Sequence, residues 1–204
     1  SGRPHSGLGW VLLLAALVAV SLALVVVLVY GGLALRFDLD QIAAMPVRTA
    51  IFDRTGVELD AGYGVKRRII TRDQIPPFLV DALQAREDLR FFSHAGVDAR
   101  GLARASLRNL RDRSLTQGGS TLTMQLARNT FDMRAKSFHR KLLEIALTLR
   151  IERRYTKDEI LVHYLNRIYF GAGCYGIEEA AQTYFGKATA DLHPGECALL
   201  VGIV

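Results

Sequence analysis

The sequence predicts a mainly α-helical domain that follows one transmembrane helix and a short β-hairpin. Three observations lead to this fold class: a long apolar run near the amino terminus, repeated helix-start signatures in the remainder, and strand-like alternation in one short segment. The 204 residues are 50% hydrophobic and include only 2 Cys, which argues against disordered, collagen-like and disulfide-scaffold proteins. The length allows one domain with an appendage.

The appendage is expected in residues 1–35, as a short cytoplasmic stub and a membrane anchor. Asp, Glu, Lys and Arg are absent between Arg3 and Arg36. As a helix, the apolar run 10–30 would be about 31 Å long, close to the roughly 30 Å hydrocarbon core of a bilayer. A cleaved signal peptide is the alternative, but its apolar core usually has about 7 to 15 residues. The few flanking charges favour an inside amino terminus and an outside remainder.

The rest of the chain divides into a linker with a hairpin over residues 36–70 and a helical domain over residues 71–204. Residues 48–59 alternate and are rich in β-branched side chains around the turn Asp53-Arg-Thr-Gly56, which is typical of a hairpin. Capping-box patterns begin at Thr71 and Thr156. The helices expected in this domain cover residues 77–88, 99–111, 121–129, 137–153 and 157–168.

The formal net charge of +6 indicates the kind of surface that the domain would meet. A basic domain behind a membrane anchor would encounter anionic headgroups or lipid phosphates, and nucleic acid is not expected outside the cell. Simple solubility is the alternative explanation of the charge. Cys174 and Cys197 do not have the spacing of metal ligands, although they could pair in an oxidising compartment.

Glu87 is the first candidate for catalysis. In a helix it would share a face with Phe91 and lie near His94. A carboxylate beside aromatic rings is a candidate proton acceptor. The structural alternative is an ordinary helix-end carboxylate, with His94 as a packing or capping residue.

Residues 117–121 form a second candidate, in which two glycines precede a helix that Ser120 could cap. The free N–H groups at such a helix start attract anions, and Arg128 and Lys136 could add full positive charges. The spacing is not that of a nucleotide P-loop. An ordinary Gly-Gly turn is the alternative.

Glu144 is the third candidate, because it lies inside an otherwise apolar helical stretch. Burying it without a partner would be costly, and Arg140 one turn earlier could pair with it. An intrahelical ion pair is therefore the structural alternative. Taken together, two glutamates, a glycine-rich helix start and nearby cations are what an enzyme needs to activate a hydroxyl and stabilise a departing diphosphate.

Four motifs resemble those of the peptidoglycan glycosyltransferase domain shared by class A penicillin-binding proteins and monofunctional transglycosylases. They are EDLRFFSHAG, GGSTLTMQ, RKLLE and KDEILVHYLN, which begin at residues 87, 118, 140 and 157. The resemblance covers residues 48–204. It implies a lysozyme-like α-helical fold with a membrane-associated jaw, preceded by a membrane anchor. Residues 99–113 are our candidate for the jaw, with a solvated helix face as the alternative.

The resemblance also implies a reaction: inverting transfer that polymerises lipid II into β-1,4-linked glycan and releases undecaprenyl diphosphate. Glu87 matches the general base that takes the proton of the acceptor's 4-hydroxyl. Glu144 matches the second essential glutamate, which orders the donor diphosphate with or without a divalent cation (Mg or Mn). The residues that it implies for substrate binding are Ser120, Thr121, Gln125, Arg128, Lys136, Arg140 and Lys141.

The same resemblance places the protein in the bacterial inner membrane as a single-pass protein with a periplasmic catalytic domain. It implies lipid II, the growing glycan chain, the bilayer and cell-wall synthesis machinery as partners, and no nucleic acid. Met124 departs from the family pattern, which has glutamine there. We expect the glycosyltransferase domain to continue beyond residue 204.

Two other functions fit the residues. A lysozyme-like peptidoglycan hydrolase would use Glu87 as a general acid, but it has no diphosphate for the cations to neutralise. A non-catalytic, membrane-anchored module would only hold lipid II or a protein partner, and it would tolerate replacement of either Glu87 or Glu144.

Overall fold

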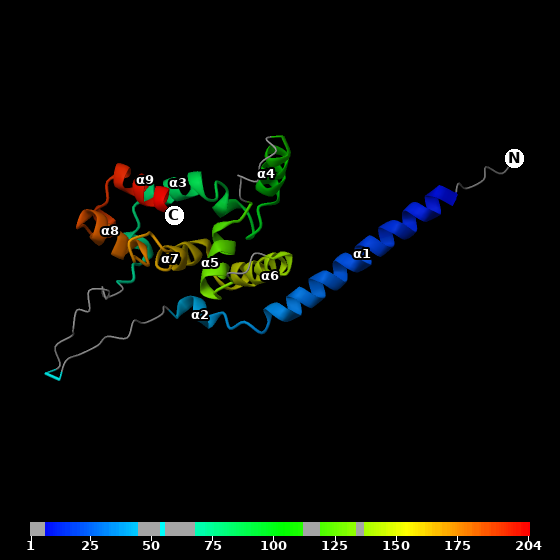
Figure 1. Cartoon of the computed structure of the whole chain (residues 1–204), viewed down its shortest axis with the longest axis horizontal. Helices are drawn as coiled ribbons and strands as arrows, with labels where there is room; N and C mark the ends of the chain where they lie inside the picture. The colour runs from blue at the N-terminus through cyan, green and yellow to red at the C-terminus, as the bar shows by residue number, and fades with distance from the viewer. Residues whose placement is uncertain (1–6, 45–53, 56–67, 112–118, 134–136) are drawn as a thin grey trace.

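The computed structural model describes residues 7–44, 54–55, 68–111, 119–133 and 137–204. These residues form helices α1 to α9 with three short 3-10 turns, and their single β-bridge joins Tyr169 to Tyr175 (Figure 1). The predicted mainly α-helical fold is confirmed. The predicted hairpin over residues 48–59 lies outside the described residues, apart from a turn at Arg54 and Thr55.

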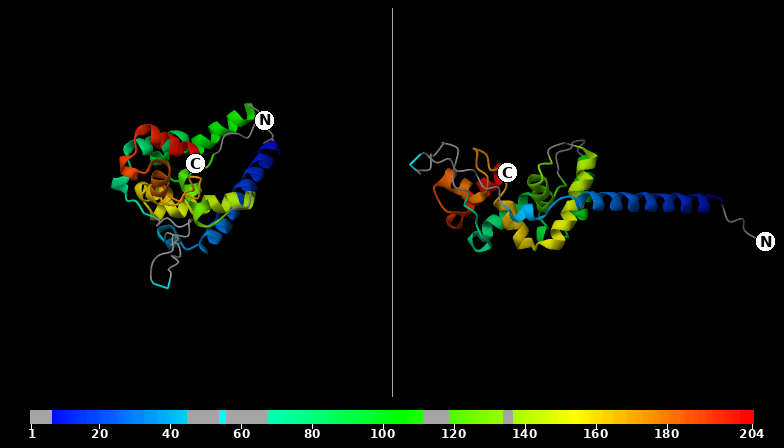
Figure 2. Two further views of the ribbon diagram at one scale, coloured as in Figure 1. Left: turned by 60° about the vertical axis from the view of Figure 1, so that its left-hand side comes forward. Right: turned by 90° about the horizontal axis from the view of Figure 1, so that it is seen from below.

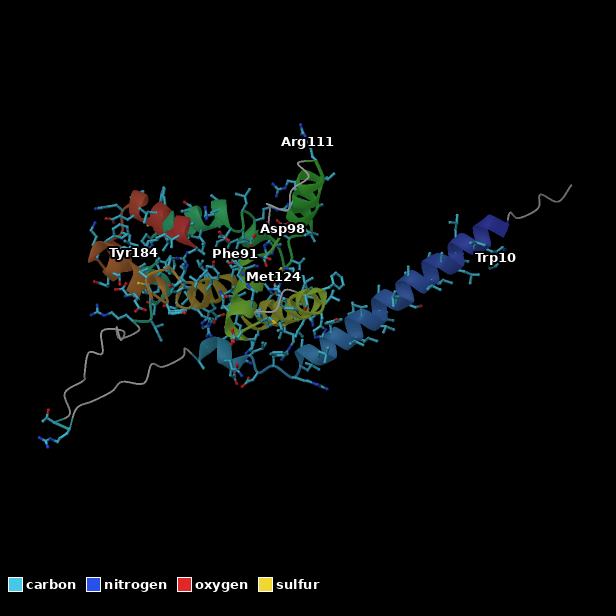
Figure 3. The ribbon with its side chains drawn as sticks, viewed as in Figure 1. Trp10, Phe91, Asp98, Arg111, Met124 and Tyr184 are labelled. Carbon is cyan, nitrogen blue, oxygen red and sulfur yellow. The ribbon has the colours of Figure 1, made fainter. Side chains whose placement is uncertain are left out.

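Helix α1 (Gly7–Ala34) projects from the rest of the molecule, and Trp10 lies near its far end (Figure 3). The part Gly9–Ala34 has a mean hydropathy of 3.2 and is long and apolar enough to cross a membrane. Length and composition therefore fit the anchor that the sequence predicts.

The body of the domain consists of the short α2 (Asp40–Ala43), α3 and α5 to α9, while α4 extends away from it. Their bounds are α3 (Pro77–Arg86), α4 (Ala99–Arg111), α5 (Leu122–Thr130), α6 (Phe138–Arg154), α7 (Lys157–Leu165), α8 (Ile177–Phe185) and α9 (Pro194–Ile203). The helices expected near residues 77, 99, 121, 137 and 157 all form. The patterns that predict the other helices do not predict α8 and α9, because α8 starts at a glycine without a side-chain cap and α9 is apolar except for Glu196 in its first turn.

Helix starts follow the predicted capping chemistry. In the box that opens α7, the Thr156 hydroxyl accepts a hydrogen bond from the Glu159 amide at 3.3 Å, and the Thr156 amide donates to the Glu159 carboxylate at 2.7 Å. The box at Thr71 opens the single turn η1 (Arg72–Gln74), after which α3 begins at Pro77. Local sequence thus determines where these helices begin.

Helix α5 is the centre of the domain, packed between α6 and α7, while α3 packs on α9. Six consecutive residues of α5, from Leu122 to Ala127, are buried. Leu147 and Ile151 of α6 pack into the same core. Helix α4 extends away from this core, with Leu102 and Leu107 exposed (Figure 1). The polar residues of α5 are therefore held inside a rigid frame.

The end of α1 runs alongside α6 (Figure 2). The Tyr30 hydroxyl lies 3.0 Å from His139 Nδ1 at the start of α6. Further along α6, the Arg150 guanidinium donates to the carbonyls of Ala34 and Phe37. These donors bind carbonyls at the end of α1 and just beyond it, so the two helices are joined by both packing and hydrogen bonds.

A second arginine holds the segment that follows α1. Arg167 Nη2 lies 2.9, 3.0 and 3.3 Å from the carbonyl oxygens of Gln41, Ile42 and Ala44. Arg167 itself is buried. These hydrogen bonds reach main-chain carbonyls, so they fix the path of the linker independently of its side chains.

We predict that Arg167→Met lowers the free energy of unfolding by roughly 2 to 4 kcal/mol, because it keeps the apolar stem but leaves several carbonyls without their charged donor. Thermal unfolding of the purified chain in detergent measures this loss. Arg153→Met, at an exposed position of α6, is the matched control. Equal melting temperatures of the two variants would contradict the prediction.

Candidate active site

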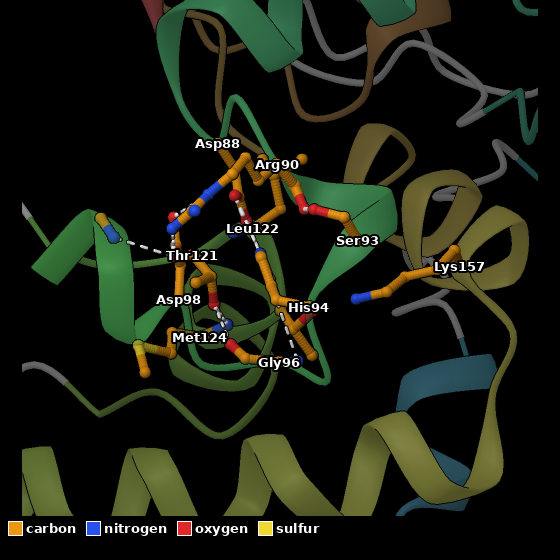
Figure 4. A network of polar contacts seen from close by, with 12 residues as sticks. Asp88, Arg90, Ser93, His94, Gly96, Asp98, Thr121, Leu122, Met124 and Lys157 are labelled. Atoms are coloured by element: carbon orange, nitrogen blue, oxygen red, sulfur yellow. Dashed lines mark hydrogen bonds and ion pairs between the residues drawn. The ribbon is translucent and has the colours of Figure 1, made fainter.

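The segment that follows α3 folds around Asp88. The Asp88 side chain is only 1% exposed and accepts hydrogen bonds from His94 Nε2 at 2.9 and 3.0 Å (Figure 4). It also accepts from the amide of Leu122, the first residue of α5, at 3.1 Å. A carboxylate at a helix start interacts favourably with the free N–H groups and the helix dipole. Asp88 therefore ties its own segment to the start of α5.

The tautomer of His94 follows from its contacts. The Gly96 amide donates to His94 Nδ1 at 3.0 Å, so the proton of the neutral ring is on Nε2, where it is donated to Asp88. Gly96 has a φ of +91°, and an added Cβ would lie 2.6 Å from Thr148 Cγ2. Only glycine fits this position. His94 thus maintains the fold of the loop.

The helix start after the glycine pair is capped by Thr121, not by Ser120 as the sequence suggested. The Thr121 hydroxyl accepts from the Met124 amide at 3.2 Å and donates to the Gly96 carbonyl at 2.6 Å. Because α5 begins at Leu122, Thr121 occupies the N-cap position, from which a hydroxyl can reach the amide three residues later. Ser120 instead contacts Lys141, whose Nζ lies 3.0 Å from its hydroxyl oxygen.

Arg90 and Asp98 fasten the same loop to α4. The Arg90 guanidinium donates to both carboxylate oxygens of Asp98, which also accepts from the Gly101 amide at 2.8 Å (Figure 4). Burial raises the pKa of Asp98, but the hydrogen bonds from Gly101 and Arg90 outweigh it and leave the pKa below its usual value. This carboxylate stays ionised at neutral pH and holds its two partners.

Glu87 lies at the carboxyl end of α3, with its side chain 20% exposed. Its Oε2 accepts from Gln125 Nε2 at 2.8 Å, and its Oε1 lies 3.4 Å from Arg86 Nε. The Tyr164 hydroxyl donates to Gln125 Oε1 at 3.1 Å. A carboxylate can only accept, so Gln125 must present its NH₂ group to Glu87 and its oxygen to Tyr164. Tyr164 and Gln125 therefore fix the orientation of Glu87.

Tyr164 is fully buried in α7. Burial, and secondly the charge of Glu87, raise the pKa of Tyr164 well above its usual value. The phenol keeps its proton and remains a donor. The sequence reasoning above gave Tyr164 no role; the available signal was a tyrosine on the apolar face of a helix, whose hydroxyl needs a partner when buried.

Glu144 is completely buried and paired with two cations. Its Oε2 accepts from Arg140 at 3.0 Å and its Oε1 from Lys141 at 2.7 Å. The intrahelical pair with Arg140, which was the structural alternative for this residue, is present, and Lys141 adds a second charge one turn away. Lys141 Nζ also lies 3.0 Å from Ser120 Oγ and 3.3 Å from Met124 Sδ. The residue that departs from the family pattern thus gives Lys141 a weak acceptor.

Two clefts lie on either side of these contacts. The larger has a volume of about 1130 Å³, and its lining includes Gln125, Arg128, Arg140, Lys141, Tyr169 and Tyr175. The smaller has a volume of about 410 Å³, and its lining includes Arg86, Glu87, Asp98, Arg104, Ser120 and Thr121. The pairs Gln125–Glu87 and Lys141–Ser120 each join one cleft to the other. The clefts therefore share a wall.

The predicted site residues that the structure describes come together around this wall. Glu87, Ser120 and Thr121 line the smaller cleft, while Gln125, Arg128, Arg140 and Lys141 line the larger one. Glu144 lies behind them, in the core. Lys136 lies outside the described residues.

The described ranges contain no group of three or more His, Cys, Asp or Glu side chains placed to hold a metal ion. Both oxygens of Glu144 accept hydrogen bonds from cations. The contacts around this carboxylate are those of an ion-pair network.

Comparison with known proteins adds the following. The family model described as Transglycosylase matches residues 55–204. The chain is 50% identical to penicillin-binding protein 1A of Escherichia coli (strain K12) over 147 residues, which is 72% of this chain and 17% of that protein. It is 40% identical to penicillin-binding protein 1A of Aquifex aeolicus (strain VF5) over 159 residues, 78% of this chain and 22% of that protein. Penicillin-binding protein 2D of Bacillus subtilis (strain 168) is 42% identical over 160 residues, 78% of this chain and 23% of that protein. The chain spans about a fifth of the length of these curated relatives.

We predict that Asp88→Asn lowers the free energy of unfolding by roughly 2 to 4 kcal/mol. An amide has the same shape, but its NH₂ group would face either the His94 or the Leu122 donor. Urea or thermal unfolding in detergent micelles measures the change. Asp81→Asn, at an exposed position of α3, should melt like the parent. If Asp88→Asn also does, the proposed link between the loop and α5 is wrong.

Proposed function

The chain belongs to the transglycosylase family, and we propose that it is a peptidoglycan glycosyltransferase that polymerises lipid II into β-1,4-linked glycan strands. The observation that carries this proposal is the shared wall: a carboxylate oriented by Gln125 lines one cleft, and the cations Arg128, Arg140, Lys141 and Arg167 line the other. One cleft thus offers a base for a hydroxyl, and the other offers charge for a diphosphate.

In this proposal the acceptor sugar binds in the smaller cleft beside Glu87. Glu87 takes the proton of the acceptor's 4-hydroxyl as that oxygen forms a bond to the anomeric carbon of the donor. The bond between this carbon and the diphosphate oxygen breaks from the opposite face, and the diphosphate leaves with the electron pair. Gln125 supports this role because it binds Glu87 through one oxygen and holds the carboxylate at the wall between the clefts.

The donor diphosphate binds in the larger cleft, where Arg128, Arg140 and Lys141 neutralise its charge. Glu144 is buried, so it acts through the two cations that it holds rather than on the substrate itself. One carboxylate against two cations leaves a net positive charge that faces the cleft. Glu144 is therefore a positioning residue in this mechanism, and Ser120 helps to place Lys141.

The membrane anchor indicates where in the cell the proposed reaction takes place. Helix α1 crosses the bacterial inner membrane once, and the catalytic domain lies on the periplasmic face, where lipid II and the growing glycan are met. The exposed leucines of the amphipathic α4 support its contact with the bilayer as the membrane-associated jaw. Cell-wall synthesis proteins are the expected protein partners.

The test supplies purified chain in detergent with labelled lipid II and no other substrate. We expect the parent to make glycan chains and Glu87→Gln to make none while it still binds lipid II, because the change removes the proton acceptor and keeps the shape. Asp81→Asn is the control and should polymerise like the parent. Polymer from Glu87→Gln would contradict its role as the base, and cleavage of finished glycan by the parent would identify a hydrolase.

We further predict that Tyr164→Phe lowers kcat about tenfold with little change in KM, since Gln125 loses the donor that orients its amide. Steady-state kinetics on lipid II separate the two constants. Tyr155→Phe removes a comparable hydrogen bond to the Leu39 carbonyl, away from Glu87, and serves as the control. An effect on KM alone, or an equal loss of kcat in the control, would exclude a positioning role for Tyr164.

A further inference from the structure

Two tyrosines that the mechanism does not use stand side by side in the lining of the larger cleft. Tyr169 and Tyr175 form the isolated β-bridge, and their ring centroids are 4.9 Å apart. Their exposed fractions are 48% and 49%, so about half of each residue faces outward. Large aromatic side chains are usually covered more fully than this, and such pairs often mark a binding surface.

The pair is held rigidly. The bridge is closed by hydrogen bonds of 2.9 Å from the Phe170 amide to the Cys174 carbonyl and from the Gly176 amide to the Ile168 carbonyl. The Tyr184 hydroxyl donates to the Phe170 carbonyl at 2.9 Å. A binding surface that is fixed in advance loses little entropy when a ligand arrives.

Glycines make this tight loop possible. Gly171, Gly173 and Gly176 have φ values of +79°, +82° and +97°, which favour glycine. An added Cβ at Gly176 would lie 2.9 Å from the Asn166 carbonyl oxygen. The close return of the chain is what places Tyr175 next to Tyr169.

The position of the pair relative to the membrane follows from α6 and Arg167. The residues Arg140 and Lys141 follow His139, which contacts Tyr30 inside the apolar helix α1. Arg167, at the other side of the cleft, contacts the linker at residues 41–44, well past the end of α1. Figure 1 shows α8, which follows Tyr175, at the end of the domain opposite to α1. The cleft thus runs from cations near the membrane to tyrosines away from it.

We propose that Tyr169 and Tyr175 form a stacking subsite for a pyranose ring of the glycan strand attached to the donor diphosphate. This inference rests on the proposed function. A lipid-linked diphosphate must stay near the membrane, so its sugars extend toward the tyrosines. The apolar C–H face of a pyranose complements the electron-rich face of an aromatic ring, and its hydroxyls remain in water. A cleft of about 1130 Å³ is far larger than a diphosphate needs and has room for sugar rings.

The test measures binding of a lipid-free tetrasaccharide of alternating N-acetylglucosamine and N-acetylmuramic acid to the full chain in detergent, by calorimetry. We expect the double variant Tyr169→Ala/Tyr175→Ala to bind about tenfold more weakly than the parent, and Tyr169→Phe/Tyr175→Phe to retain most of the affinity because its rings remain. Phe78→Ala is the control: Phe78 is exposed on α3 and lines neither of these clefts. Helical circular dichroism checks that each variant is folded.

A second measurement is the length distribution of chains made from lipid II. If the tyrosines hold the growing strand, the double alanine variant makes shorter chains than the parent. Should that variant fail to fold, Tyr175→Leu keeps an apolar side chain without the ring, and the same loss of affinity is expected.

The outcomes separate the two proposals. Unchanged tetrasaccharide binding in the folded alanine or leucine variant overturns the subsite, and so does an equal loss in Phe78→Ala. A parent that makes no polymer, but whose tetrasaccharide binding depends on the tyrosine rings, supports the subsite and overturns the polymerase. A parent that polymerises lipid II without binding the tetrasaccharide overturns the subsite alone.

Discussion

The geometry of the site depends on one buried carboxylate, Asp88, at the start of α5. It binds the ring of His94 on one side and the first amide of α5 on the other. Because Asp88 is next to Glu87 in the chain, the same contact sets the distance between Glu87 and Gln125, which lies one turn into α5. A buried, fully bonded polar group is strongly directional, so it determines a unique docking of loop and helix where apolar packing alone would allow sliding.

The second constraint is the balance of charge around Glu144. Burying a lone carboxylate costs free energy, and the ion pairs of Glu144 with Arg140 and Lys141 offset this cost. The two cations are not fully used by Glu144, since Lys141 also reaches Ser120 and Met124. The arrangement leaves positive charge at the wall of a cleft while its counter-charge lies in the core. An anion that enters the cleft therefore completes the network.

Local sequence patterns were sufficient where a structure depends on neighbouring residues. The cap at Thr156 and the pair Arg140–Glu144 each involve residues about one turn apart, and the apolar length of α1 is visible as one continuous run. The patterns failed where a partner comes from elsewhere in the chain. Thr121 caps α5 in place of Ser120, and its hydroxyl also donates to the carbonyl of Gly96, 25 residues earlier.

The role of Tyr164 was missed for the same reason, because its partner is distant in the sequence. Its hydroxyl binds Gln125, a residue 39 positions away, and no local period reports such a contact. The described residues singled out from the sequence do lie around one wall between two clefts, but hydrogen-bond partners from elsewhere in the chain were not predictable from local patterns. The expected helical face shared by Glu87 and Phe91 was wrong, because α3 ends at Arg86, and the His94 ring binds Asp88.

Helix α6 connects the membrane geometry to the chemistry. Along one helix, His139 lies beside the apolar anchor, Arg140 and Lys141 line the larger cleft, and Arg150 binds the end of α1. A rigid helix with a rise of about 1.5 Å per residue fixes the distances between these positions along α6. A tilt of α1 would therefore move the cations together with the anchor. If the substrate is a lipid-linked diphosphate, this coupling keeps the cationic wall at the height where the diphosphate emerges from the bilayer.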